Sequence, residues 1–284
     1  MENLAYYDGK VGTVDEVTIP FNDRSHFFGD GVYEATMGAN GVPYLVEDHL
    51  DRFYSSARAL GIVIPSGKDE LKQLLFDLLA KVDGDTHFVY WQVTRGVAMR
   101  DHVYGSDMEG KLWVLIRPQA LGGIRTPVNV TVTEDKRFEY GHVKTLNLLP
   151  AVLYSQMAHD RDACETILHR NGVVTECSHS NVSILKDGVF YSHPNDEHIL
   201  RGIAKTHMIQ ACYRLGIPVI ERAFTLDQLF DADEIMISSS SKFCLPVRSI
   251  DGQAVAGRDP ENLNALQDEL IREFRDYTGS NALD

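Results

Sequence analysis

The sequence lacks the features that mark membrane, secreted and nucleic-acid-binding proteins. No apolar run is long enough to cross a bilayer, and the first residues, MENLAYYDGK, have neither the basic nor the apolar region of a signal peptide. The formal net charge of -14 leaves no excess of cations for nucleic acid or an anionic membrane surface. Repeats and low-complexity stretches are also missing. These absences indicate a globular cytoplasmic protein without nucleic-acid or membrane partners.

Cysteine is scarce, and its spacing carries no chemical signature. The four cysteines, Cys164, Cys177, Cys212 and Cys244, form no C-x-x-C pair, as expected for reduced thiols in the cytosol. No H-E-x-x-H motif or Cys/His cluster has metal-ligand spacing, so we predict no metal site. A G-x-G-x-x-G turn after a first strand and a G-x-S-x-G elbow are absent too, which argues against a dinucleotide-binding fold and a hydrolase.

What the sequence does contain is a pattern in which strands outnumber helices and hairpins are frequent. Asp8-Gly9, Asn171-Gly172 and Asp187-Gly188 each separate two strand-like runs, as in tight hairpins. Residues between 19 and 41 are expected to form a loop that enters a strand with Tyr33 on it. Other strands are expected at 86–96, 112–118, 128–135, 165–170, 173–176, 181–186, 189–193, 218–223 and 234–238. Helices are expected at 46–60, 68–82, 148–163 and 203–215, from Thr225, and at 260–279.

A chain of 284 residues is long enough for two modest domains. The segment PQALGGIRTP combines proline, glycine and small residues between two strand runs, which is typical of a linker. We therefore predict an N-terminal α+β domain at 1–118, a linker at 119–125, and a C-terminal α+β domain at 126–284. Both domains should have mainly antiparallel sheets flanked by helices.

The stretch 142–182 holds one lysine and one acid of chemical interest. Lys144 lies where a strand-like segment gives way to a helix, and Glu176 lies at the end of an apolar strand before small polar residues. A lysine amine can form a Schiff base with a carbonyl, and a carboxylate at a fixed distance can keep a pyridine nitrogen protonated. These are the two groups that a pyridoxal phosphate enzyme needs most.

Three other places have the chemistry of an anion site. Gly202 precedes a helix, so the amides of Ile203 and Ala204 can face an anion, although a glycine there is also common without any ligand. The serines at 238–241 end an apolar strand and can bind phosphate or simply form a turn. Arg52 lies beside the apolar stripe of its helix. Its forked donors match the oxygens of a phosphate, but a solvated helix arginine is an equally ordinary explanation.

A polar loop after the strand at 86–96 carries an Arg-x-His pair. Arg100 supplies a charged fork and His102 a further donor, a combination that can bind a carboxylate. Solvated loop charges are an equally ordinary explanation. Tyr33 can likewise be a half-buried strand tyrosine with no ligand.

Taken together, the motifs resemble those of fold-type IV pyridoxal phosphate enzymes, over nearly the whole chain and in the same order. That superfamily contains branched-chain aminotransferases, D-amino-acid aminotransferases and aminodeoxychorismate lyases. Arg100, His102 and Tyr33 in GDGVYE resemble the D-amino-acid aminotransferase branch in particular. The matching segments are FGDGVYE, HLDRFY, VKTLNLLPAVL, ETILHRNGVVTECSHSNV, ILRGIAK and EIMISSSS.

The resemblance implies a role for each matching residue. Lys144 is expected to form the Schiff base with pyridoxal 5'-phosphate and to move a proton, and the C-terminal domain is expected to carry it. Glu176 is expected to pair with the pyridine nitrogen and Leu200 to pack under the ring. Other expected cofactor contacts are Arg52, Gly202, Ile203, Ala204, Ser239 and Ser240. The α-carboxylate of the substrate is expected to bind Tyr33, Arg100 and His102, the last two from the partner subunit of a homodimer.

The chain departs from the family's pattern at five positions near the expected site. Ala204 stands where relatives often have a threonine that adds to the phosphate contacts. Cys177 and His179 replace small residues beside Glu176. Lys242 and Phe243 replace a small and an acidic residue after the serine run.

The resemblance implies a ping-pong transaminase that acts on a D-amino acid such as D-alanine and a 2-oxo acid such as 2-oxoglutarate. Three alternatives on the same scaffold are a branched-chain L-amino-acid transaminase, an (R)-amine transaminase and an aminodeoxychorismate-type lyase. A binding or regulatory protein without catalysis is a further alternative, although the presence of both Lys144 and Glu176 argues against it.

Overall fold

The computed structural model describes residues 1–283, which form two compact units. Each unit is assembled from separate parts of the chain. The first contains Met1–Leu121, Val143–Asn147 and Phe274–Ala282, and the second contains Gly122–His142, Leu148–Glu273 and Leu283.

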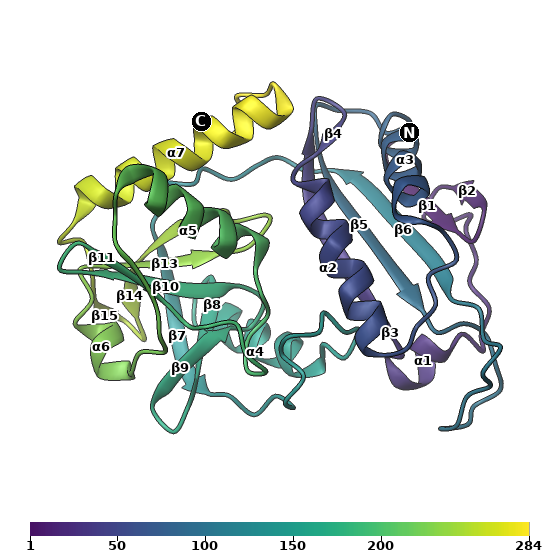
Figure 1. The fold of residues 1–284 in the computed structure, drawn as a ribbon, viewed down its shortest axis with the longest axis horizontal. Helices are drawn as coiled ribbons and strands as arrows, with labels where there is room; N and C mark the ends of the chain where they lie inside the picture. The colour runs from purple at the N-terminus through teal and green to yellow at the C-terminus, as the bar shows by residue number, and fades with distance from the viewer. Residues whose placement is uncertain (284) are drawn as a thin grey trace. The chain divides into compact units, whose positions relative to one another are not determined.

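An antiparallel six-stranded sheet forms the centre of the first unit, in the order β2-β1-β6-β5-β3-β4 (Figure 1). The expected first hairpin is confirmed, with Asp8 and Gly9 in the left-handed region at φ of 47° and 91°. The strands are β1 (Leu4–Tyr7), β2 (Lys10–Gly12), β3 (Gly31–Ala39), β4 (Val42–Pro43), β5 (Thr86–Thr94) and β6 (Lys111–Pro118).

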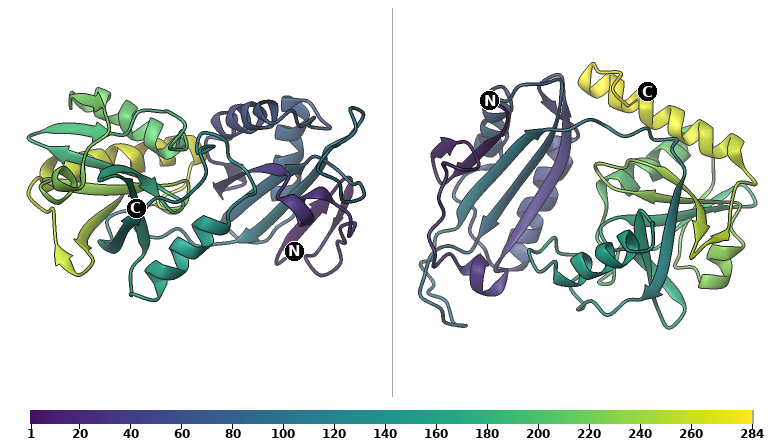
Figure 2. Two further views of the ribbon diagram at one scale, coloured as in Figure 1. Left: turned by 90° about the horizontal axis from the view of Figure 1, so that it is seen from below. Right: turned by 180° about the vertical axis from the view of Figure 1, so that it is seen from behind.

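Two longer helices, α2 (Val46–Ala59) and α3 (Lys68–Leu79), cover one face of this sheet (Figure 2). Their apolar residues recur at helical spacing, as the sequence predicts, and form one core with the inward side chains of the strands. Phe53 of α2 packs against Trp91 of β5 with ring centroids 6.2 Å apart. This core gives the residues on α2 and β3 a rigid support.

A short helix, α1 (Arg24–Phe28), lies within the stretch that the sequence predicts as a loop entering a strand. Asp23 begins it, because its carboxylate accepts the backbone N–H of Ser25 at 2.9 Å. Gly29 ends it in the left-handed conformation. The prediction of β3 after it, with Tyr33 on the strand, is confirmed.

The second unit contains a nine-stranded sheet that is mixed in direction. The pairs β11–β12, β14–β7 and β7–β8 are parallel, and the other five pairs within the described residues are antiparallel. The expected α+β fold with mainly antiparallel sheets is therefore confirmed. The strands are β7 (Val128–Glu134), β8 (Glu165–Arg170), β9 (Val173–Cys177), β10 (Asn181–Lys186), β11 (Val189–Ser192), β12 (Val219–Glu221), β13 (Glu234–Ser238), β14 (Leu245–Ile250) and β15 (Gln253–Ala254).

The remaining helices begin and end close to the residues that the sequence predicts. Thr225 caps its helix with its hydroxyl, and Gly216 ends the helix before it. Across residues 1–283, no helix has the length and apolar character needed to cross a membrane. The helices are α4 (Leu149–His159), α5 (Ile203–Leu215), α6 (Leu226–Phe230) and α7 (Pro260–Thr278).

The segment with Lys144 packs with the first unit, whereas the predicted C-terminal domain includes it. Backbone hydrogen bonds explain the difference. The Tyr33 N–H donates to the Lys144 carbonyl at 3.0 Å, and the Leu146 N–H donates to the Gly31 carbonyl at 3.0 Å. Val32 and Thr145 form an isolated antiparallel bridge between these two contacts. The segment therefore lies alongside β3 and pairs with its first residues.

Candidate functional site

Hydrogen bonds of its backbone N–H and carbonyl hold Lys144 in place, and they do not involve its side chain. Besides accepting from Tyr33, Lys144 donates its own N–H to the Ser56 hydroxyl of α2 at 3.3 Å. Gly31 allows this close approach, because a Cβ there would lie 2.6 Å from both Leu146 Cδ1 and the Val93 carbonyl oxygen. A lysine amine on so rigid a backbone is well placed for covalent chemistry.

The Lys144 amine lies over an aromatic pair. Its Nζ is 4.2 Å from the ring centroid of Tyr33, which in turn stacks on Tyr90 at 5.5 Å. Tyr90 donates its hydroxyl to Gln92 at 2.6 Å, and burial raises the pKa of Tyr90. Tyr33 and Lys144, both predicted from the sequence, are therefore neighbours in the structure.

Arg52 is bound to a buried acid that the sequence did not single out. Glu34 of β3 is fully buried and accepts from Arg52 Nε at 2.6 Å, from Arg52 Nη2 at 2.8 Å, and from His49 Nδ1 at 2.6 Å. Burial opposes ionisation, but Arg52 and His49 together lower the pKa of Glu34 to about 2. Burial lowers the pKa of His49 despite Glu34, so His49 binds as a neutral donor near pH 7. Glu34 thus fixes the side chain of Arg52 on α2.

We expect Glu34→Gln to lower the free energy of unfolding of the first unit by about 3 kcal/mol at pH 7, because it removes one member of a buried ion pair. The contribution is complete above about pH 4.5, the ordinary pKa, and is lost as the pH falls toward the folded value of about 2. Urea unfolding followed by tryptophan fluorescence measures it, since both tryptophans, Trp91 and Trp113, lie in this unit.

The matched control for Glu34→Gln is Asp51→Asn, which removes from α2, the helix that carries Arg52, an exposed partner of Lys68 on α3. Exposed ion pairs contribute little, so this control should shift the urea midpoint only slightly. Equal midpoints for the two variants would show that the buried pair does not stabilise the unit.

Arg100 and His102 lie on an exposed loop, and both approach the ring of Phe28. The Arg100 guanidinium is 5.3 Å from the ring centroid of Phe28, and the His102 ring is 5.2 Å from the same ring. Arg24 of α1 anchors the loop by donating to the Asp101 carbonyl at 2.7 Å. The structure therefore brings this predicted pair together, at one end of the first unit.

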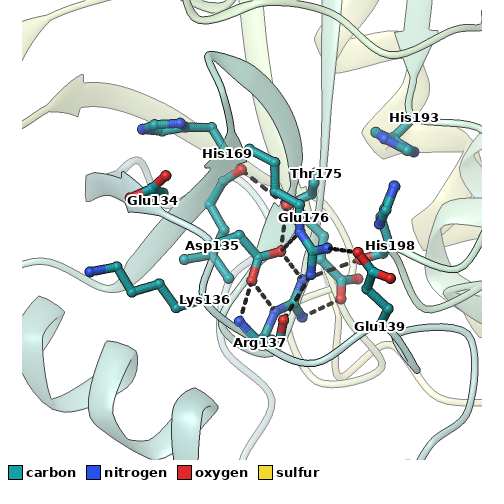
Figure 3. A network of polar contacts seen from close by, with 12 residues as sticks. Glu134, Asp135, Lys136, Arg137, Glu139, His169, Thr175, Glu176, His193 and His198 are labelled. Atoms are coloured by element: carbon teal, nitrogen blue, oxygen red, sulfur yellow. Dashed lines mark hydrogen bonds and ion pairs between the residues drawn. The ribbon is translucent and has the colours of Figure 1, made fainter.

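In the second unit, Glu176 belongs to a polar network with Arg137 and Asp135 (Figure 3). Its Oε1 accepts from Arg137 Nη1 at 2.6 Å, and its Oε2 accepts from Asn181 Nδ2 and the Leu200 N–H, each at 3.0 Å. Arg137 also forms two 2.9 Å hydrogen bonds to Asp135, which follows β7. The carboxylate is therefore held on both oxygens by separate elements.

The hydrogen bonds of the network suit the charged form of Glu176, although its pKa is raised above the ordinary value. Burial is the larger effect and raises the pKa of Glu176, and the Arg137 guanidinium opposes this only in part. Three donors and no acceptor face the carboxyl group in the contacts above, which suits a carboxylate. A carboxylate offers about four acceptor positions, so one more donor can bind. A protonated ring nitrogen is such a donor.

Gly202, which precedes α5, is required for packing. A Cβ at this position would lie 1.8 Å from the Asn181 side-chain oxygen. Gly202 is the N-cap of α5 and has no side chain to cap the first turn, where Ile203 and Ala204 lie. The N-terminus of α5 therefore lies against Asn181, which in turn binds Glu176. Backbone N–H groups at a helix N-terminus suit an anion.

The predicted serines begin at the last residue of β13, which pairs with β10 so that Ser238 lies opposite Asn181. The Ser238 hydroxyl is buried and has no hydrogen-bond partner among the described residues. Ser239 accepts the Lys242 N–H at 3.2 Å. Serine hydroxyls, the N-terminus of α5 and a fixed carboxylate thus share one region of the second unit, and their chemistry fits a phosphorylated pyridine.

The predicted site residues are divided between the two units. Lys144, Tyr33 and Arg52 belong to the first unit, as do Arg100 and His102. All the other predicted contacts belong to the second. The residues that sequence reasoning missed are partners of the predicted ones, namely Glu34, His49, Tyr90, Asp135, Arg137 and Asn181.

Comparison with known proteins identifies the family. The sequence profile described as Amino-transferase class IV matches residues 31–250, which is well over half of the chain. The chain belongs to the class IV aminotransferases. A D-alanine aminotransferase of Listeria monocytogenes is 42% identical over 247 residues, covering 85% of this chain and 86% of the relative. The expected resemblance to D-amino-acid aminotransferases is thereby confirmed.

Solved structures agree on the fold of this class IV aminotransferase. The branched-chain aminotransferase of Escherichia coli superimposes with a TM-score of 0.88 at 21% identity, over 98% of this chain and 95% of that one. A T.th. branched-chain aminotransferase, solved with pyridoxamine 5'-phosphate, gives a TM-score of 0.84 at 22% identity, over 97% and 96% of the two chains. Fold-type IV aminotransferases are pyridoxal phosphate enzymes.

Proposed function

We propose that this aminotransferase moves the amino group of a D-amino acid such as D-alanine to a 2-oxo acid such as 2-oxoglutarate, by a ping-pong route with pyridoxal 5'-phosphate. The observation that carries the proposal is the 42% identity to a D-alanine aminotransferase over 247 residues. The presence of Lys144 and Glu176, each rigidly held, supports it.

The cofactor supplies an aldehyde that accepts the amino group and a ring that withdraws electrons from the substrate Cα. Glu176 is proposed to hold the ring nitrogen in its protonated form, with Arg137 and Asn181 fixing the direction of the carboxylate. Leu200 is proposed to pack under the ring. Phosphate contacts are proposed for Arg52, Gly202, Ile203, Ala204, Ser239 and Ser240.

Lys144 is proposed to bind the cofactor through Nζ and then, once released by substrate, to act as the base at Cα. Its backbone bonds to Tyr33 and Ser56 keep the origin of the side chain fixed while the amine moves. A base fixed on one side of the substrate removes only a hydrogen that faces it. Lys144 therefore sets the stereochemistry once the carboxylate is held.

Tyr33, Arg100 and His102 are proposed to hold the α-carboxylate. The loop with Arg100 and His102 is exposed, and Met99 and Val103 on it are 81% and 79% exposed. Exposed apolar side chains beside a charged pair suit contact with another protein surface. We propose that this surface belongs to a second copy of the chain, so that the loop serves the partner's site in a homodimer.

The proposed enzyme works in the cytoplasm. All four cysteines are free thiols in the structure, which suits a reducing compartment.

A visible spectrum of the purified protein, saturated with pyridoxal 5'-phosphate, tests the proposed function. We expect a cofactor absorption band that D-alanine shifts and that 2-oxoglutarate then restores. L-Alanine is the control and should leave the band unchanged. A protein with no cofactor band would overturn the proposal, and a band that responds to L-leucine or to a simple amine but not to D-alanine would replace its substrate class.

Arg100→Ala is expected to raise the KM for D-alanine by about tenfold or more, with a smaller effect on kcat, because it removes a charged partner of the α-carboxylate. Arg117→Ala is the matched control, since Arg117 also lies over a phenylalanine ring, at 5.2 Å from Phe88. Steady-state kinetics with varied D-alanine measures both. An unchanged KM in Arg100→Ala would refute the assignment.

A further inference from the structure

A second buried acid, Glu165, lies in the second unit outside the network of Glu176. It is the first residue of β8 and is fully buried. The hydroxyl groups of Ser178 and Ser180 donate to it, the latter at 2.6 Å. His179 Nδ1 and Lys242 Nζ lie 3.0 and 3.1 Å from its Oε2. One carboxylate therefore collects donors from two different loops.

The first loop is the tight turn between β9 and β10. The Cys177 N–H donates to the Ser180 carbonyl at 2.7 Å, and the Ser178 N–H donates to the Thr166 carbonyl at 3.0 Å. Glu176 precedes this turn and Asn181 follows it, so Glu165 fixes the turn that connects the two.

The second loop joins β13 to β14 and holds the predicted phosphate serines. Lys242 donates its backbone N–H to both the carbonyl and the hydroxyl oxygen of Ser239, each at 3.2 Å, and the Phe243 N–H donates to the same carbonyl at 2.8 Å. Phe243 has a φ of +54°, in the left-handed region, which closes the turn. The conformation of Ser239 is therefore set by the residue whose side chain reaches Glu165.

The Lys242–Glu165 contact is a true ion pair. Burial alone would lower the pKa of Lys242, but Glu165 raises it above the ordinary value. Burial opposes ionisation of Glu165 as well, yet His179 and Lys242 lower its pKa. Both groups are thus charged near pH 7, and the side chain of Lys242 is only 15% exposed. An ion pair in this environment restricts the loop more than an exposed pair does.

We propose that the Lys242–Glu165 ion pair positions the serine loop, residues 239–241, to bind the phosphate of the cofactor. Lys242 is a positioning residue that acts through Ser239, and it sets the affinity for the phosphate group in particular. This inference rests on the proposed function, since it takes the phosphorylated cofactor as the ligand. Lys242 replaces the small residue that the family pattern has at this position, and the proposal gives this lysine a structural role.

The test compares two probes, pyridoxal 5'-phosphate and pyridoxal, which lacks the phosphate. Dissociation constants are measured on the cofactor-free full chain by absorbance titration. In Lys242→Met we expect the constant for pyridoxal 5'-phosphate to rise by about tenfold and that for pyridoxal to change by less than about twofold. Lys242→Arg, which keeps the charge, should retain most of the affinity for pyridoxal 5'-phosphate.

Lys186→Met is the matched control, because Lys186 makes ion pairs with Asp231 and Asp233 elsewhere in the same unit. It should change neither dissociation constant. Thermal stabilisation of the cofactor-free protein by inorganic phosphate is a second readout, and it should be weaker in Lys242→Met than in the wild type and in Lys186→Met.

If Lys242→Met weakened the binding of both probes equally, or of neither, the inference would be overturned while the proposed function stayed in place. A wild-type chain that binds neither probe would overturn the proposed function and this inference with it. Should Lys242→Met fail to fold, Lys242→Gln is measured in the same way, and an unchanged ratio of the two constants there overturns the assignment.

Discussion

We expect the Lys144→Ala variant to fold normally and to lose transaminase activity by about 10⁴-fold. One side chain is proposed both to hold the cofactor and to move the proton at Cα, so its removal eliminates two contributions at once. The fold should survive because the backbone N–H and carbonyl of Lys144, and not its amine, bond to Ser56 and Tyr33. Tryptophan fluorescence and urea unfolding check the fold, and steady-state kinetics checks the loss.

Two further measurements separate Lys144 from any other lysine. Borohydride treatment of the cofactor-loaded wild type, followed by peptide mass spectrometry, should locate the cofactor on the peptide with Lys144. Lys111→Ala is the control substitution, since Lys111 lies in the same unit and pairs with Asp8 near the surface. It should transaminate at the native rate. A Lys144→Ala variant as active as this control would show that another amine does the chemistry.

Local sequence signals predicted most of the fold. The pairs Asp8-Gly9, Asn171-Gly172 and Asp187-Gly188 all adopt the left-handed conformation that their residue types allow, and each closes the expected hairpin. Helices α2 and α3 follow the spacing of their apolar residues closely. These elements depend on neighbours in the sequence, which is why they can be predicted from it.

Contacts between distant segments were beyond this kind of reasoning. The parallel pairing of β7 with β8 and β14 depends on which strands meet in the folded sheet. The placement of Lys144 beside β3 depends on hydrogen bonds to Tyr33 and Gly31, more than a hundred residues away. Neither leaves a periodic pattern in the sequence.

The candidate site likewise contains residues that local motifs predict and residues that only contacts between distant segments reveal. Lys144 and Glu176 were predicted because their residue types match a chemistry and stand in family motifs. Arg137 was missed, since it lies in an irregular polar loop after β7 and only the fold brings it to Glu176. Glu34 was missed because an acid within an apolar strand has no visible partner until α2 packs on β3. Residues that hold a predicted site residue in place can be identified only once the tertiary structure is known.

The charge of Glu176 is open to a direct test. We expect Glu176→Gln to reduce kcat by at least about 10²-fold, because an amide of the same size cannot stabilise a proton on the ring nitrogen as an anion does. The structure should tolerate the change, since Arg137 keeps its two hydrogen bonds to Asp135 and a third to the His198 carbonyl. Steady-state kinetics with D-alanine and 2-oxoglutarate measures the loss.

Two comparisons make the result specific to charge at this position. Glu176→Asp keeps the anion at a shorter reach and should recover part of the activity. Glu139→Gln removes an exposed acid that pairs with Arg170 at 3.2 Å beside the same network, and it should behave as the wild type. The absorption spectrum of the bound cofactor, titrated with pH, should change in Glu176→Gln and not in Glu139→Gln, because only the former alters the protonation of the ring. If Glu176→Gln kept both the native kcat and the native pH titration, the carboxylate would serve only to anchor Arg137, and the ring nitrogen would have to find its partner elsewhere.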